Sequence, residues 1–146
     1  MTLSENKTAA KTLFAPLPVA PRGTEVMDDV FRAVGAALTQ WEFVETAFAE
    51  LFGTLLGAPG GSAARAYGVV TTSGARRDMI SQAAQGEFPH DEVLLAQIKD
   101  VLSIAEVGSQ RRNEIAHGAV MRLTDRGEDR GCYLIPPTYV SKKFRF

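Results

Sequence analysis

The chain lacks several features that would assign it to a common class of protein. It has one cysteine, Cys132, which excludes an internal disulfide and fits a reducing compartment, so we expect a cytoplasmic protein. None of its apolar runs approaches the roughly 18 residues that a membrane span needs, so we expect no membrane segment. The 146 residues, 45% hydrophobic and 23% charged, are typical of a single globular domain.

The usual catalytic signatures are also missing. The sequence contains no GxGxxG, no phosphate loop ending in Gly-Lys-Ser/Thr and no GxSxG elbow. Its two histidines, His90 and His117, do not combine with Cys132 into any zinc-binding spacing. These absences argue against nucleotide-dependent and hydrolase-fold enzymes, and we expect neither a cofactor nor a metal.

The net charge is close to zero, but the charges are unevenly distributed along the chain. The net charge is −1, yet residues 109–146 carry eight Lys and Arg against four Asp and Glu, a net charge of +4. This asymmetry permits a partner that carries phosphate at the C-terminal end, although charge alone favours an ordinary solvated surface.

Apolar residues at three- and four-residue steps predict a first helix of more than thirty residues, or two helices, from an N-cap at Thr24 to the Gly57–Gly61 stretch. The stripe consists of Val30, Val34, Ala37, Leu38, Trp41, Val44, Phe48, Leu51, Phe52 and Leu55. A second helix is predicted from Ser62 to about Gln85.

A third helix is predicted from near Asp91, and Gly108-Ser109 either kinks it or starts a short fourth helix ending at His117. After Gly118 the apolar period falls to two, which predicts a β-hairpin of residues 119–124 and 132–135 across a turn at 125–131, closed by Pro136-Pro137. We therefore expect a mainly α protein: a flexible arm over 1–23, an up-and-down bundle of three to five helices over 24–118, and a hairpin with a basic tail over 119–146.

The segment that best supports chemistry is 111–118, Arg-Arg-Asn-Glu-Ile-Ala-His-Gly. Asn113 and His117 share one helix face, so Asn113 could orient the imidazole. Arg112 lies about 140° away from His117 around a straight helix. Both can reach one phosphate only if the helix unwinds, the guanidinium bends round, or another subunit contributes. The alternative is that His117 and Gly118 simply cap the helix.

This segment resembles a known family. Arg112-Asn113-x-x-x-His117 is similar to the Arg-x4-6-His motif of HEPN (higher eukaryote and prokaryote nucleotide-binding) domains. The local amino-acid sequence is also similar to that of bacterial HEPN-like proteins of unknown function. The resemblance implies a homodimeric helical bundle whose two motifs face each other. Many members are metal-independent ribonucleases, often toxins paired with a nucleotidyltransferase-like antitoxin. By this resemblance Arg112 and His117 are catalytic and Asn113 is a supporting polar residue.

Two functions follow from these residues. In the first, the protein is a metal-independent endoribonuclease with RNA as substrate, His117 as general base and Arg112 as phosphate clamp. In the second, it is a non-catalytic dimeric binding or assembly module. Burial of His117 with its nitrogens bonded to backbone would favour the module. A two-fold arrangement that places both copies of Arg112 and of His117 in one open, positive cleft would favour the enzyme.

Two charged residues border the helical stripes and suggest a structural ion pair. Glu45 lies at the edge of the first stripe and Arg77 at the edge of the second. Such charges are usually partly exposed with their stems packed on apolar neighbours. The alternative is that Glu45 pairs with Arg77 or Arg112 and fixes the helix register.

Overall fold

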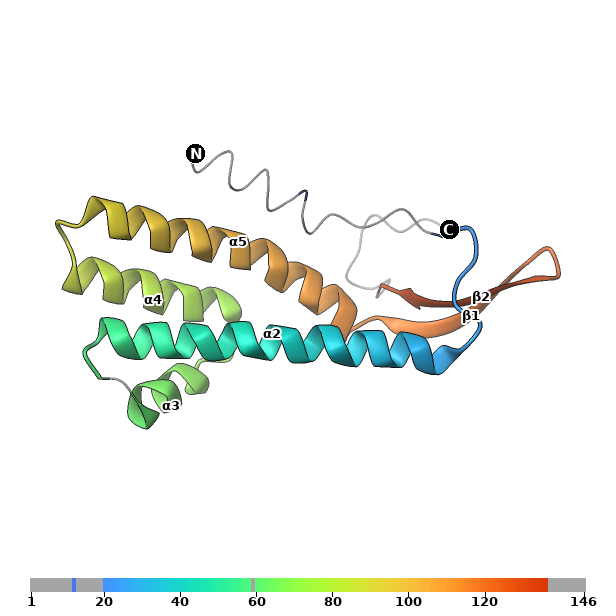
Figure 1. Cartoon of the computed structure of the whole chain (residues 1–146), viewed down its shortest axis with the longest axis horizontal. Coiled ribbons are helices and arrows are strands. Elements are labelled where there is room, and N and C mark those ends of the chain that lie inside the picture. Colours follow the sequence, from blue (N-terminus) through green and yellow to red (C-terminus); the bar gives the residue numbers. More distant parts are fainter. Residues whose placement is uncertain (1–11, 13–19, 59, 137–146) are drawn as a thin grey trace. The chain divides into compact units, whose positions relative to one another are not determined.

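The computed structural model describes residues 12, 20–58 and 60–136 and is mainly helical with a C-terminal hairpin, as predicted (Figure 1). In chain order the elements are α2 (Met27–Leu55), α3 (Gly61–Val69), α4 (Ser73–Glu87), α5 (Glu92–Ala116), β1 (Ala119–Asp125) and β2 (Glu128–Ile135). The described residues divide into two compact units, one of residues 42–109 and one of 20–41 and 110–136, so α2 and α5 each contribute to both. Most of the predicted arm (1–11, 13–19) and of the tail (137–146) lies outside the described residues.

The first predicted helix is a single helix, α2, but it begins at Met27 and not just after Thr24. The backbone of Thr24 is extended, and its N–H and C=O both hydrogen-bond to Cys132 in a β-bridge. The expectation that Thr24 caps the helix is therefore wrong. Its extended pairing delays the start of the helix by two residues.

The second predicted helix is two helices, α3 and α4, and the prediction of one continuous helix from Ser62 to Gln85 is wrong. The break is extended backbone at Val70, where φ is −75° and ψ is 121°. Thr72 then caps α4, with its hydroxyl accepting a hydrogen bond from the N–H of Ala75 at 3.3 Å. Three β-branched residues, Val70 to Thr72, disfavour helix here, and Thr72 offers the new cap.

The third predicted helix is α5, and it runs without a break through Gly108 and Ser109 to Ala116. The Asp91 carboxylate accepts a hydrogen bond from the N–H of Leu94 at 2.9 Å, which is the N-cap arrangement. Gly108 and Ser109 are both buried, so these small residues serve close packing and do not end the helix.

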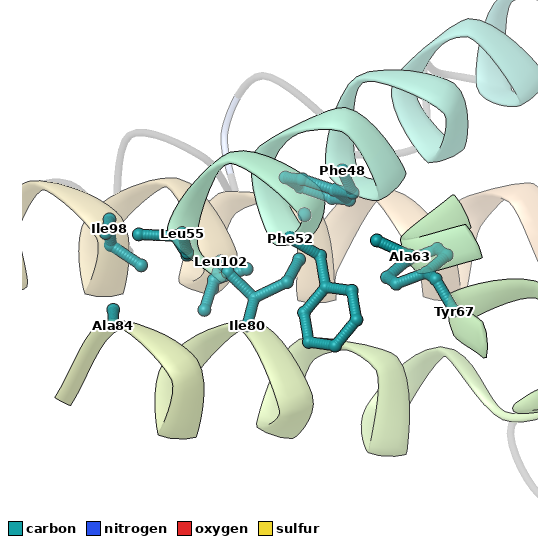
Figure 2. Packing of buried hydrophobic residues seen from close by; sticks show 10 residues of the cluster. Phe48, Phe52, Leu55, Ala63, Tyr67, Ile80, Ala84, Ile98 and Leu102 are labelled. Atoms are coloured by element: carbon teal, nitrogen blue, oxygen red, sulfur yellow. The ribbon is translucent and has the colours of Figure 1, made fainter. Parts of the chain in front are cut away.

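The core lies within the unit of residues 42–109 and is built from the C-terminal half of α2, with α3, α4 and α5 (Figure 2). Ile80 and Ala84 of α4 are fully enclosed, at 0% exposure. The remaining core residues are Phe48, Phe52, Leu55, Ala63, Tyr67, Ile98, Leu102 and Ala105. Burial of these side chains from each helix is the main force that holds the four elements together.

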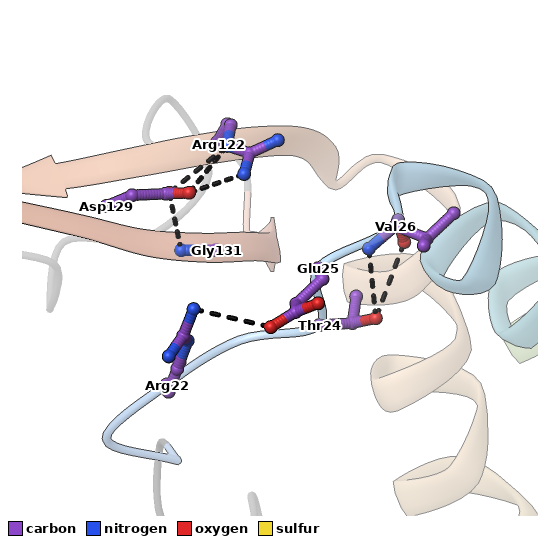
Figure 3. Close-up of polar contacts among 7 residues, drawn as sticks. All are labelled: Arg22, Thr24, Glu25, Val26, Arg122, Asp129 and Gly131. Carbon is purple, nitrogen blue, oxygen red and sulfur yellow. Dashed lines mark hydrogen bonds and ion pairs between the residues drawn. The ribbon is translucent and has the colours of Figure 1, made fainter.

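The other unit contains the hairpin, whose strands pair antiparallel with Ala119 opposite Ile135. The turn is shorter than the predicted 125–131: Arg126 and Gly127 form it, both with positive φ (50° and 84°), as a two-residue hairpin turn requires. A bulge follows, because Leu123 pairs with Gly131 and Thr124 with Asp129. Figure 3 shows the hairpin beside the segment that leads into α2.

Candidate functional site

The predicted motif occupies the last turn of α5 and the residue after it. Arg112 is half-buried, while Asn113 and His117 are exposed. The N–H of His117 donates to the carbonyl of Asn113 at 3.0 Å, so the helical hydrogen-bond pattern continues to His117. The helix therefore does not unwind before the histidine.

This continuity limits how the motif can act. With the helix intact, Arg112 and His117 stay about 140° apart around its axis. Unwinding of the helix is therefore not how Arg112 and His117 could reach one phosphate. A bent guanidinium or a second subunit remains.

Asn113 contacts the arginine of the motif. Its Oδ1 accepts a hydrogen bond from Nη1 of Arg112 at 3.1 Å. Arg111, next to it, forms an ion pair with Glu114. Asn113 thus holds the guanidinium through a neutral amide, whereas the sequence suggested that it would orient the imidazole.

The side chain of His117 is exposed. Within the part of the chain that the structure describes, its imidazole makes no hydrogen bond or ion pair. The arrangement expected of a purely structural histidine, buried with its nitrogens bonded to backbone, is not found in these residues.

Gly118 has a packing role in place of the expected left-handed cap. It is not among the glycines with positive φ, which are Gly57, Gly60, Gly127 and Gly131 in the described residues. A Cβ at position 118 would lie 2.7 Å from Cδ1 of Leu134, closer than such atoms approach. Glycine therefore follows the histidine because β2 packs against the backbone there.

Glu45 and Arg77, the predicted ion pair, both lie in the unit of residues 42–109, and there Glu45 forms an ion pair with Arg76. Its Oε2 accepts hydrogen bonds from Nη1 of Arg76 at 2.8 Å and from the hydroxyl of Tyr67 at 3.2 Å. The sequence did not predict Arg76 as a partner of Glu45. The alternative pairing of Glu45 with Arg112 stays a prediction. Arg77 instead donates to the hydroxyl of Ser109 at 3.3 Å.

Tyr67 and Arg76 were not singled out from the sequence, yet they complete this cluster. The guanidinium carbon of Arg76 lies 5.2 Å from the centre of the Tyr67 ring, and its Nε donates to the carbonyl of Val70 at 2.7 Å. Burial, reinforced by the Glu45 carboxylate, raises the pKa of the Tyr67 hydroxyl well above its ordinary value. The available signal was the four-residue spacing of Ala63 and Tyr67, which places both on one helix face.

A hollow of about 380 Å³ lies between α4 and α5, lined in part by Ala84, Leu95, Ile98 and Lys99. None of the predicted site residues lines it.

The described part of the chain holds no group of three or more His, Cys, Asp or Glu side chains that could bind a metal ion. Among the described helices, none combines the length and the apolarity that crossing a membrane requires.

Comparisons of the chain with models of protein families, with curated proteins and with solved structures found no match.

Proposed function

We propose that the protein is a metal-independent endoribonuclease of HEPN type, with Arg112 and His117 as its catalytic residues and Asn113 as a support for Arg112. The observation that carries the proposal is the exposed His117, whose imidazole has no partner among the described residues, at the end of the helix that bears Arg112. A helix-capping role would engage the imidazole with the last carbonyls of the helix.

The chemistry follows from these groups. His117, as general base, takes the proton from an RNA 2′-hydroxyl, and the 2′-oxygen attacks the adjacent phosphorus. The bond from phosphorus to the 5′-oxygen breaks, and that oxygen takes up a proton. Arg112 neutralises the charge that develops on the phosphate oxygens. The products carry a 2′,3′-cyclic phosphate and a 5′-hydroxyl.

A second copy of the chain is part of the proposal. None of residues 27–47 of α2, all of them described, is buried, and Phe31 and Val44 on its apolar side are 54% and 37% exposed. An apolar helix face of this length is typical of an interface. A dimer also offers a way to bring Arg112 and His117, separated around one helix, to a common phosphate.

Cleavage of single-stranded RNA by purified variants tests the function. We expect His117→Ala and Arg112→Ala each to abolish cleavage, and excess EDTA to leave the wild-type rate unchanged. Arg111→Ala is the matched control, because it removes the same charge one residue earlier from an arginine paired with Glu114. His90→Ala is the corresponding control for the histidine.

The same assay decides between the two functions. A wild-type protein that cuts none of a varied set of RNAs, or full activity in His117→Ala, would reject the ribonuclease and favour the dimeric binding or assembly module.

A further inference from the structure

We infer that the contact between Leu134 of β2 and the backbone of Gly118 positions His117, so that the hairpin acts as a clamp on the end of α5. The role of His117 in this inference rests on the proposed function, whereas the contact itself does not. Gly118 and Leu134 are positioning residues and are not expected to touch RNA.

A side chain at position 118 would require the Leu134 side chain to shift. A Cβ there would meet Cδ1 and Cγ of Leu134 at 2.7 and 2.9 Å and the carbonyl oxygen of Glu114 at 3.2 Å. The Leu134 side chain is therefore seated directly on the chain one residue after the histidine. Its position determines where the backbone can leave the helix.

Leu134 is in turn carried by a strand that is held on both edges. On one edge Leu134 pairs with Val120 of β1. On the other edge, Cys132 donates to the carbonyl of Thr24 at 2.7 Å and accepts from its N–H at 3.2 Å, and Gly23 donates to Arg130 at 2.8 Å.

This second edge also depends on glycine. A Cβ on Gly23 would lie 2.3 Å from the carbonyl oxygen of Cys132, and one on Gly131 would lie 2.8 Å from the carbonyl oxygens of Gly23 and Thr24. The two glycines allow the segment before α2 to pack against β2. That close packing ties the strand, and Leu134 with it, to the start of α2.

The backbone of His117 is thus held from both sides. Before it, the helical bond to Asn113 fixes its N–H. After it, Gly118 is pinned by Leu134. Because the imidazole makes no hydrogen bond to the described residues, these backbone restraints set where the ring can go.

The chemical shifts of the imidazole C–H protons test this, because the chain has only two histidines and His90 serves as an internal reference. We expect Gly118→Ala to move the His117 resonances and leave those of His90 in place. Adding Leu134→Ala, which makes room for the new methyl group, should restore most of the wild-type shift. Gly35→Ala is the control, since a Cβ there meets nothing within 4 Å.

Activity gives an independent readout. We expect Gly118→Ala to lower kcat by on the order of tenfold with little change in KM, and the double variant to recover it. Should Gly118→Ala not fold, Leu134→Ala alone must shift the His117 resonances and not those of His90.

Two results would overturn the inference: unmoved His117 resonances, or additive effects of the two substitutions. A wild-type protein that cuts no RNA but shows the coupled shifts would reject the proposed function and leave the clamp standing.

Discussion

Glu45 shows at the residue scale how one charge can be accommodated in an apolar helix stripe. Its side chain is 13% exposed and that of Arg76 is 24% exposed, so the pair is largely removed from water. The Tyr67 hydroxyl also donates to Glu45, and the carbonyl of Val70 accepts from Arg76. The cluster joins α2, α3 and α4, because Glu45, Tyr67 and Arg76 come from one helix each.

Removing the carboxylate should therefore be costly. We expect Glu45→Ala to lower the free energy of unfolding by about 2–4 kcal/mol, because it leaves Arg76 and the Tyr67 hydroxyl without this partner in a low-exposure site. Chemical denaturation measures the change. Glu50→Ala, an exposed glutamate on the same helix, should change it by less than about 0.5 kcal/mol. A loss below about 1 kcal/mol for Glu45→Ala would mean that the pair behaves as an exposed one.

The sequence could predict that Glu45 is special but not its partner. Periodicity places Glu45 at the edge of the stripe in α2, and that inference needs only the spacing of its neighbours. The choice between Arg76 and Arg77 depends on the exact start of α4. Extended backbone at Val70 sets that start, and the sequence analysis had assumed a continuous helix.

At the scale of elements, an ion pair stabilises the hairpin in addition to the backbone hydrogen bonds between its strands. Nε of Arg122 lies 3.1 Å from both carboxylate oxygens of Asp129, across the bulge (Figure 3). The N–H of Gly131 donates to the same carboxylate at 2.9 Å. These bonds lower the pKa of Asp129 from 3.8 to about 2, and the hydrogen bond from Arg122 has the largest effect.

The hairpin should therefore respond to acid in a defined range. Because the pKa of Asp129 is lowered by folding, its contribution to stability is present above about pH 4 and is lost as the pH falls through about 2. Carboxyl carbon NMR should show Asp129 titrating at about 2 in the wild type. In Arg122→Gln the midpoint should rise toward 3.8.

Arg130→Gln is the control, because Arg130 pairs with Asp125 and Glu128 and should leave Asp129 unchanged. An Asp129 midpoint near 3.8 in the wild type would contradict this account of the ion pair.

How well the elements could be predicted depends on whether a local signal fixed each boundary. The period of two after Gly118 is local, and the hairpin followed from it. The bulge and the tight turn were missed because they depend on the positive φ of Arg126, Gly127 and Gly131, and the sequence alone did not show which of these residues form the turn. The start of α2 was missed because Thr24 pairs with Cys132, a contact across more than a hundred residues.

For the whole molecule, the proposed dimer can be tested at the apolar first half of α2. We expect light scattering at micromolar concentration to give twice the mass of one chain. Phe31→Asp should weaken the dimer by about tenfold or more, because it places a charge on an exposed apolar position of the proposed interface. Ala36→Asp, about 140° around the same helix, introduces the same charge on the polar side and should leave the dimer intact. A monomeric wild type would contradict the proposed assembly.

The chemical identity of the cleaved ends tests the central claim most directly. A histidine base acting on the 2′-hydroxyl without a metal must leave a 2′,3′-cyclic phosphate and a 5′-hydroxyl. We therefore predict that RNA cut by the wild-type protein in excess EDTA carries these two ends by mass spectrometry, and that His117→Ala produces no such fragments. Fragments with 5′-phosphate and 3′-hydroxyl ends, or cyclic-phosphate products that persist in His117→Ala, would contradict the assignment of Arg112 and His117.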